Sequence, residues 1–159
     1  MLLNINNKIN ITLCGMMGSG KSVIGKILAK KLDYNFIDID KVIETETNKT
    51  IKKIFEENGE RYFRDLEEKI TINILDNKKT VVSLGGGAII NNKIRKSIKK
   101  NSYNIYLKVE VDILKNRLQN SKTRPLIYKK NLKKKLINLI NKREIFYQKA
   151  DLIIKNEKN

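Results

Sequence analysis

A glycine-rich octet, G-x-x-x-x-G-K-S at residues 15–22, constrains the fold of this chain more than any other feature. The apolar run before it, residues 9–14, is typical of a buried strand. After it, apolar residues recur at spacings of three and four, which predicts a helix; they are Val23, Ile24, Ile27, Leu28 and Leu32. Strand, glycine-rich turn and helix is the context that a phosphate-binding loop requires.

The residue types in the octet suit phosphate chemistry. Glycines let backbone N–H groups converge on phosphate oxygens, and the helix N-terminus adds a partial positive charge. Lys21 can reach the β- and γ-phosphates, and the Ser22 hydroxyl can bind Mg²⁺. The alternative is a glycine turn with an incidental Lys-Ser pair, which the two flanks disfavour. We therefore predict these ATP-binding residues: Gly15, Gly18, Ser19, Gly20, Lys21, Ser22 and Val23.

The rest of the chain alternates short apolar runs with helical patterns. The predicted strands are 9–14, 35–38, 80–84, 103–108 and 151–155. The predicted helices are 20–32, 40–47, 51–57, 60–76, 92–100, 111–119 and 132–149. This alternation predicts an α/β fold of three layers, α/β/α, around a five-stranded parallel sheet, and residues 1–159 suit a single domain. Ligands of such sheets bind beyond the carboxyl ends of the strands.

The composition is strongly basic, with 34 Lys+Arg against 17 Asp+Glu and a formal net charge of +17. This charge could serve nucleic-acid binding, could attract small anions, or could reflect the Lys, Asn and Ile codons of an AT-rich genome. Aromatic residues make up only 6% and do not interleave with the basic runs, as a base-stacking surface would need. We predict small-molecule partners and no nucleic acid.

Other features bear on location and assembly. We expect neither a membrane span nor a secretory signal, because the sequence has no apolar run of about 18 residues and no charged start followed by an apolar stretch. Cys14 has no second cysteine to pair with, and we expect it to be a small buried apolar residue. These observations predict a cytoplasmic protein. Its small size favours a monomer.

Two carboxylates, Asp38 and Asp40, follow the second predicted strand. Asp40 could simply cap the next helix. Alternatively, one carboxylate approaches Mg²⁺ while the other orients or deprotonates an acceptor hydroxyl, since the chain has no histidine to act as base. No aspartate ends the third strand, so metal binding would fall to Ser22, Asp38 and water.

A long helix is predicted after Gly59, with its apolar stripe formed by Phe63, Leu66, Ile70 and Ile74. Arg64 lies off that stripe, and Glu67 and Glu68 follow it at i+3 and i+4. Taken alone, this pattern favours an exposed ion pair. The functional alternative has Arg64 holding an anionic substrate while Glu67 fixes its rotamer.

Three glycines, Gly85, Gly86 and Gly87, come directly after the third strand. A turn does not need three, so we expect them to bring bare backbone close to another group, the alternative being an unusual loop.

Further arginines occur late in the chain. A polar loop after Arg117 contains Arg124 and the only proline, and such a loop could close over phosphates with Arg124 stabilising the transferring group. Arg143 could be a favourable cation near a helix C-terminus.

Taken in order, these elements resemble the shikimate kinase family. They are G-x-x-G-S-G-K-S, the D-x-D after strand two, F-R-x-x-E, S-L-G-G-G-A, R-P-L and K-R-x-x-x-Y, over roughly residues 10–155. Gluconate kinases carry S-A-L-K and adenylate kinases D-G-F-P-R after strand three, and this chain has neither.

The resemblance implies a phosphate-loop kinase that uses ATP and Mg²⁺ to phosphorylate the 3-hydroxyl of shikimate, on the pathway to chorismate and aromatic amino acids. It implies residues 39–66 as the substrate-binding segment and residues 120–130 as a lid. The implied substrate-binding residues are Asp40 at the reacting hydroxyl, Arg64 and Arg143 on the carboxylate, Glu67, and Gly85, Gly86 and Gly87. The other implied roles are Asp38 near Mg²⁺, Lys21 and Arg124 on phosphate oxygens, and Arg117 against adenine.

Two alternatives stay open from the sequence. One is another small-molecule or nucleotide kinase of the same fold, such as a gluconate kinase. The other is a basic nucleotide-binding regulator without catalytic activity.

Overall fold

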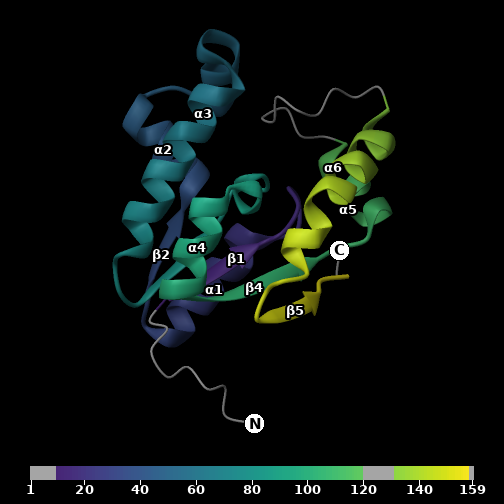
Figure 1. Ribbon diagram of the computed structural model, residues 1–159. Helices are drawn as coiled ribbons and strands as arrows, with labels where there is room; N and C mark the ends of the chain where they lie inside the picture. The colour runs from purple at the N-terminus through teal and green to yellow at the C-terminus, as the bar shows by residue number, and fades with distance from the viewer. Residues whose placement is uncertain (1–9, 120–130, 158–159) are drawn as a thin grey trace.

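A computed structural model describes residues 10–119 and 131–157 and contains one sheet of five parallel strands in the order β2-β3-β1-β4-β5 (Figure 1). The strands are β1 Asn10–Cys14, β2 Asn35–Asp38, β3 Thr80–Ser83, β4 Ser102–Lys108 and β5 Leu152–Lys155. The helices are α1 Lys21–Leu32, α2 Ile39–Thr47, α3 Ile51–Leu75, α4 Asn92–Asn101, α5 Val111–Leu118 and α6 Leu132–Tyr147, with a short 3-10 turn at Ala88–Ile90. The predicted parallel sheet is confirmed.

Successive strand residues face opposite sides of the sheet and build two separate cores. Leu13 faces the core that α1 covers, whereas Cys14 faces the larger core formed with α3, α4 and α6. The predicted three layers follow from this alternation. Burial raises the pKa of the Cys14 thiol to about 12, so Cys14 is the inert apolar residue that we expected.

Helix α1 begins where the spacing predicts, but only part of the apolar pattern packs against the sheet, namely Ile24 and Leu28, which are half-buried against the core on this side. Val23 and Ile27 are 65% and 53% exposed, while Gly25 and Ala29 are buried against the sheet. A Cβ at Gly25 would lie 2.5 Å from the Phe36 ring, so the missing side chain allows the helix to approach β2 closely. Apolar periodicity therefore identified the helix, but not which of its apolar residues pack against the sheet.

Helix α3 consists of two segments separated at Gly59, whose φ of 81° and ψ of 171° are not helical. The sequence predicted this division, with helices at 51–57 and 60–76. The predicted apolar stripe is confirmed at Phe63, Ile70 and Ile74, which are buried. Within the described part of the chain, no helix has the length and apolar character that crossing a membrane requires.

Neighbouring strands bring the predicted motifs to one edge of the sheet. Strand β3 pairs with β1 on one side and with β2 on the other, all in parallel register. The phosphate-loop octet follows β1, the two aspartates come at the end of β2, and the glycine run follows β3. Because parallel strands end at the same edge, segments far apart in the sequence meet there.

Candidate active site

The phosphate-binding loop has the backbone that its glycines permit. Gly15, Gly18 and Gly20 have φ values of 142°, 79° and 91°, a region that side chains with a Cβ rarely adopt. A Cβ at Gly15 would also lie 2.6 Å from the carbonyl oxygen of Leu107. The Lys21 ammonium donates to the carbonyl oxygens of Gly15 and Met16, both at 2.9 Å, so its charge lies at the loop.

Two polar side chains from distant elements support this loop. The Arg117 guanidinium on α5 donates to the Gly18 carbonyl at 3.1 Å. The Asn156 amide, just after β5, donates to the Ser19 carbonyl at 2.8 Å, and its backbone N–H donates to Lys108. Arg117 thus lies beside the phosphate loop, and its contact with adenine stays a prediction. Sequence reasoning missed Asn156, because a single asparagine in a polar tail has no pattern to mark it.

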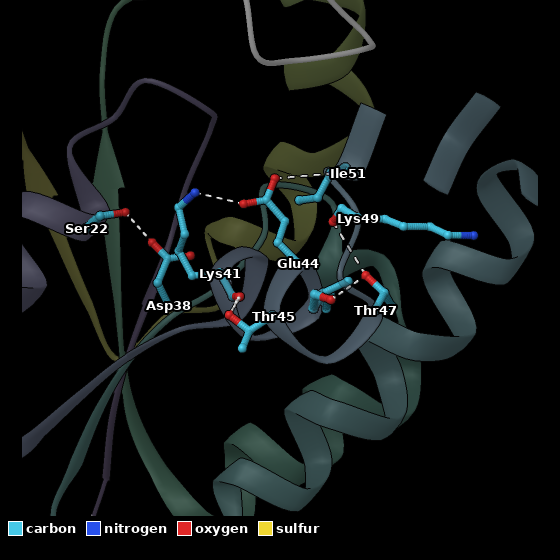
Figure 2. A network of polar contacts seen from close by, with 9 residues as sticks. Ser22, Asp38, Lys41, Glu44, Thr45, Thr47, Lys49 and Ile51 are labelled. Carbon is cyan, nitrogen blue, oxygen red and sulfur yellow. Dashed lines mark hydrogen bonds and ion pairs between the residues drawn. The ribbon is translucent and has the colours of Figure 1, made fainter. Parts of the chain in front are cut away.

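The two predicted metal ligands contact each other. The Ser22 hydroxyl donates to Asp38 Oδ2 at 2.5 Å (Figure 2). Asp38 occupies the N-cap position of α2, but its side chain accepts no hydrogen bond from the helix backbone. Asp40 lies in the first turn of α2 rather than at the cap, so the capping explanation for Asp40 is wrong. Among the described residues, no cluster of three or more His, Cys, Asp or Glu could hold a metal ion.

A second network, also visible in Figure 2, joins α2 to α3 at the rim of the cavity. Glu44 accepts a hydrogen bond from the Lys41 ammonium at 2.7 Å and another from the Ile51 backbone N–H at 3.2 Å. Lys41 and Glu44 both line the cavity described below. The sequence did not identify either residue, since an i, i+3 ion pair is common on exposed helices.

Arg64 is held by two carboxylates of its own helix. Its guanidinium donates to Glu67 Oε2 at 2.7 Å and to Glu60 Oε1 at 3.1 Å. Glu67 is only 1% exposed, so this contact is not the surface ion pair that the pattern alone favoured. Glu68, the other candidate partner, instead accepts from Lys93 and Asn91.

Burial sets the charge balance of this pair. Burial raises the pKa of Glu67, Asp40 adds to that rise, and the guanidiniums of Arg64 and Arg143 oppose it. For Arg64, burial acts against its charge, but Glu67 and Glu60 outweigh it and hold the pKa of Arg64 above its usual value. The second oxygen of Glu67, Oε1, has no hydrogen-bond partner among the described residues. The structure thus keeps a permanent cation at the cavity wall.

The glycine run after β3 leaves room for the side chains of the site. A Cβ at Gly85 would lie 2.3 Å from Glu67 Oε1 and 3.0 Å from Asp40 Oδ1. A Cβ at Gly87 would lie 2.6 Å from an Arg64 nitrogen. The prediction that bare backbone approaches another group is confirmed, and these groups are the candidate substrate-binding side chains.

Arg143 on α6 is 2% exposed, so it is not the solvated cation at a helix end that we considered. Its Nη1 contacts the Met16 sulfur at 3.7 Å, and a Cβ at Gly86 would lie 3.4 Å from the same nitrogen. Its Nε–H has no hydrogen-bond partner among the described residues. A buried guanidinium with a free N–H suits an anionic ligand.

One cavity of about 440 Å³ unites these groups. Asp40, Arg64 and Arg143 line it together with Lys21 and Ser22. Arg124 and the predicted lid, residues 120–130, lie outside the described residues. A phosphate loop, a carboxylate and two guanidiniums around one cavity define a kinase of the phosphate-loop class with a pocket for an acceptor.

Comparisons with known proteins specify the class further. The family model described as shikimate kinase matches residues 17–159. The chain is 44% identical to the shikimate kinase of Persephonella marina over 148 residues, which is 93% of this chain and 89% of that protein. It is 40% identical to the shikimate kinase of Bartonella henselae over 99% of this chain and 75% of that protein.

Solved structures agree. The shikimate kinase of Acinetobacter baumannii, in complex with shikimate, matches with a TM-score of 0.93 and 34% identity over 98% of this chain and 87% of that one. A gluconokinase from Sinorhizobium meliloti matches with a TM-score of 0.56 at 16% identity, which shows a shared fold alone. The chain belongs to the shikimate kinase family.

Proposed function

We propose that this chain transfers the terminal phosphoryl group of ATP to the 3-hydroxyl of shikimate. The observation that carries the proposal is that Asp40, Arg64 and Arg143 line the same cavity as Lys21 and Ser22. Family membership suggests shikimate as the acceptor. The cavity provides guanidiniums for its carboxylate, and Asp40 for its reacting hydroxyl.

On the acceptor side, Arg64 and Arg143 bind the shikimate carboxylate. Glu67 holds one Arg64 nitrogen, and the Arg143 guanidinium lines the same cavity. Two guanidiniums around one carboxylate fix its orientation, because each can donate parallel N–H bonds. This clamp directs the ring hydroxyls toward Asp40 and the phosphate loop.

On the donor side, the backbone N–H groups of residues 15–20 and the α1 N-terminus bind the phosphates. The Lys21 ammonium moves from its loop carbonyls to phosphate oxygens. Ser22 and Asp38 fit Mg²⁺, since they bring a hydroxyl and a carboxylate oxygen together at the loop, and Mg²⁺ needs few protein ligands beside phosphates and water. When bound, the ion neutralises charge on the transferring group.

The chemical step needs one base and one displacement. The Asp40 carboxylate accepts the proton of the 3-hydroxyl as that oxygen forms a bond to the terminal phosphorus. The bond between this phosphorus and the ADP oxygen breaks, and ADP leaves with that electron pair. Positioning and charge stabilisation supply most of the catalysis in such reactions.

A coupled ADP-release assay with shikimate, gluconate and nucleoside monophosphates tests the proposal. We expect turnover above background ATP hydrolysis with shikimate alone. Stimulation by another acceptor and none by shikimate would contradict it. A basic regulator without catalytic activity would instead bind oligonucleotides with a steep dependence on salt and would be unaffected by Asp40→Asn.

We further propose that the protein acts as a monomer in the cytoplasm. Its one cysteine is buried, and the site is built from this chain's own elements. Light scattering after size exclusion tests the monomer directly, and a mass near twice 18.5 kDa would contradict it.

A further inference from the structure

A buried tyrosine outside the cavity holds one of the glycines in its wall. The Tyr147 hydroxyl donates a hydrogen bond to the Gly86 carbonyl oxygen at 2.5 Å. Tyr147 is completely buried in the large core, whereas Gly86 and Gly87 line the cavity. The bond therefore runs from the core to the inner side of the cavity wall.

Because the peptide group is planar, the direction of the Gly86 carbonyl determines the direction of the Gly87 N–H. In a trans peptide the carbonyl and the following N–H point in opposite directions, and the Gly86–Gly87 peptide is trans. With the Gly86 carbonyl held toward Tyr147 in the core, the Gly87 N–H is directed to the other side, where the cavity lies. This N–H has no partner among the described residues, although its neighbour in the turn, the Ala88 N–H, donates to Gly85.

Without the hydrogen bond from Tyr147, the Gly86–Gly87 peptide could rotate, because glycine restricts the backbone little. Gly86 lacks the Cβ that restricts other residues, and a Cβ there would lie 3.4 Å from the Met17 backbone nitrogen and from the Arg143 guanidinium. Arg143 therefore lies directly against this glycine, and another group is needed to fix the peptide. Tyr147 lies on the same helix as Arg143, four residues later. One face of α6 therefore carries both the guanidinium at the cavity and the hydroxyl that fixes the peptide.

We propose that Tyr147 is a positioning residue: its hydroxyl fixes the Gly86–Gly87 peptide so that the Gly87 N–H is presented to the acceptor beside Arg64 and Arg143. This inference rests on the proposed function, since the acceptor is the group that the N–H meets. Burial raises the pKa of Tyr147, which keeps its phenol protonated and able to donate.

The chain offers a matched control in the same aromatic stack. The Tyr106 ring packs against the Tyr147 ring with centroids 4.8 Å apart and planes at 18°. The Tyr106 hydroxyl also donates a hydrogen bond, but to Glu144, at 2.8 Å and away from the glycine run. Tyr106→Phe and Tyr147→Phe therefore remove equivalent groups, of which one contacts the cavity wall.

The test compares the two variants in steady-state kinetics, with shikimate binding measured by calorimetry in the absence of ATP. We expect Tyr147→Phe to raise the KM and the Kd for shikimate about threefold to tenfold, the range for one lost neutral hydrogen bond, with the KM for ATP within twofold of wild type. Tyr106→Phe should leave all three constants within twofold. Tyr106→Phe should melt no higher than Tyr147→Phe, because the hydrogen bond that it loses is to a carboxylate; a selective effect of Tyr147→Phe on shikimate is then not explained by a greater loss of stability.

Two results would overturn the proposal. One is a shikimate KM for Tyr147→Phe within twofold of wild type. The other is an equal rise for Tyr106→Phe or for the KM of ATP, since either would indicate general loosening of the structure. If the wild type shows no shikimate-dependent turnover, the proposed function fails as well. If the wild type turns shikimate over and Tyr147→Phe has the same KM for shikimate, only the role of Tyr147 fails.

Discussion

Replacing Gly87 with alanine should damage acceptor binding while leaving the fold intact. Gly87 has φ of −97° and ψ of −12°, a conformation that alanine adopts without strain. Its new Cβ would lie 2.6 to 2.8 Å from three atoms of the Arg64 guanidinium. Ordinary contact begins at 3.4 Å, so the nearest nitrogen must move by about 0.8 Å. The side chain end can move, and the backbone need not.

That displacement has a calculable cost in binding. Hydrogen bonds to charged groups contribute about 1.5–3 kcal/mol, and a shift of this size removes the alignment of Arg64 with both Glu67 and the shikimate carboxylate. Loss of one such bond corresponds to roughly a 10- to 150-fold rise in the KM for shikimate. The KM for ATP should not change, because the displaced group, Arg64, is assigned to the acceptor and not to the phosphates.

Gly25→Ala is the control for this experiment. Its Cβ would lie 2.5 Å from the Phe36 ring and 3.1 Å from Leu13, two packed side chains that have less freedom to move than the end of the Arg64 side chain. We expect it to lower the free energy of unfolding by about 1–3 kcal/mol without a selective rise in the KM for shikimate. Steady-state kinetics and urea unfolding of both variants check the contrast. A wild-type KM for shikimate in Gly87→Ala, or a loss of stability as large as that of Gly25→Ala, is incompatible with a clash confined to the Arg64 side chain.

Three further predictions follow from the described contacts. Lys21→Ala should remove ATP binding and turnover together, and titration with a fluorescent nucleotide that still shows binding would contradict this. Because burial raises the pKa of Glu67, its protonated form stabilises the folded state at low pH. The free energy of unfolding in urea should therefore fall as the pH rises from about 4.3 through the raised pKa, and Glu67→Gln should make this fall smaller. An equal dependence of stability on pH in the variant and the wild type would contradict this. The Cys14 thiol should react with a thiol reagent only after unfolding in urea, whereas rapid labelling of the native protein would show that it is accessible.

The order and type of the elements could be predicted because each has a local cause. The glycines of the octet fix the turn, Gly59 divides α3, and short apolar runs give the strands. The packing of α1 could be predicted only in part from apolar spacing, since the pattern includes the packed Ile24 and Leu28 but also the exposed Val23 and Ile27. Its close approach to the sheet depends on Gly25 and Ala29, which the hydrophobic pattern ignores.

Where a motif fixes both residue type and position, as for Lys21, Ser22 and the aspartates at the end of β2, the sequence predicted residues that line one cavity, and their roles stay predictions. The direction of Arg64 could not be predicted, since its spacing from Glu67 equally describes a surface ion pair. Contacts between distant segments, such as that of Asn156 with the Ser19 carbonyl, depend on the tertiary fold alone. No local pattern in the sequence indicates them.

A crystal structure with ADP, Mg²⁺ and shikimate bound would show whether Asp40, Arg64 and Arg143 bind the acceptor together. We expect the shikimate carboxylate between Arg64 and Arg143, with its 3-hydroxyl against Asp40 and facing the phosphate loop. A carboxylate that lies away from both arginines, or a hydroxyl other than the 3-hydroxyl facing Asp40 and the phosphates, would contradict the proposed function.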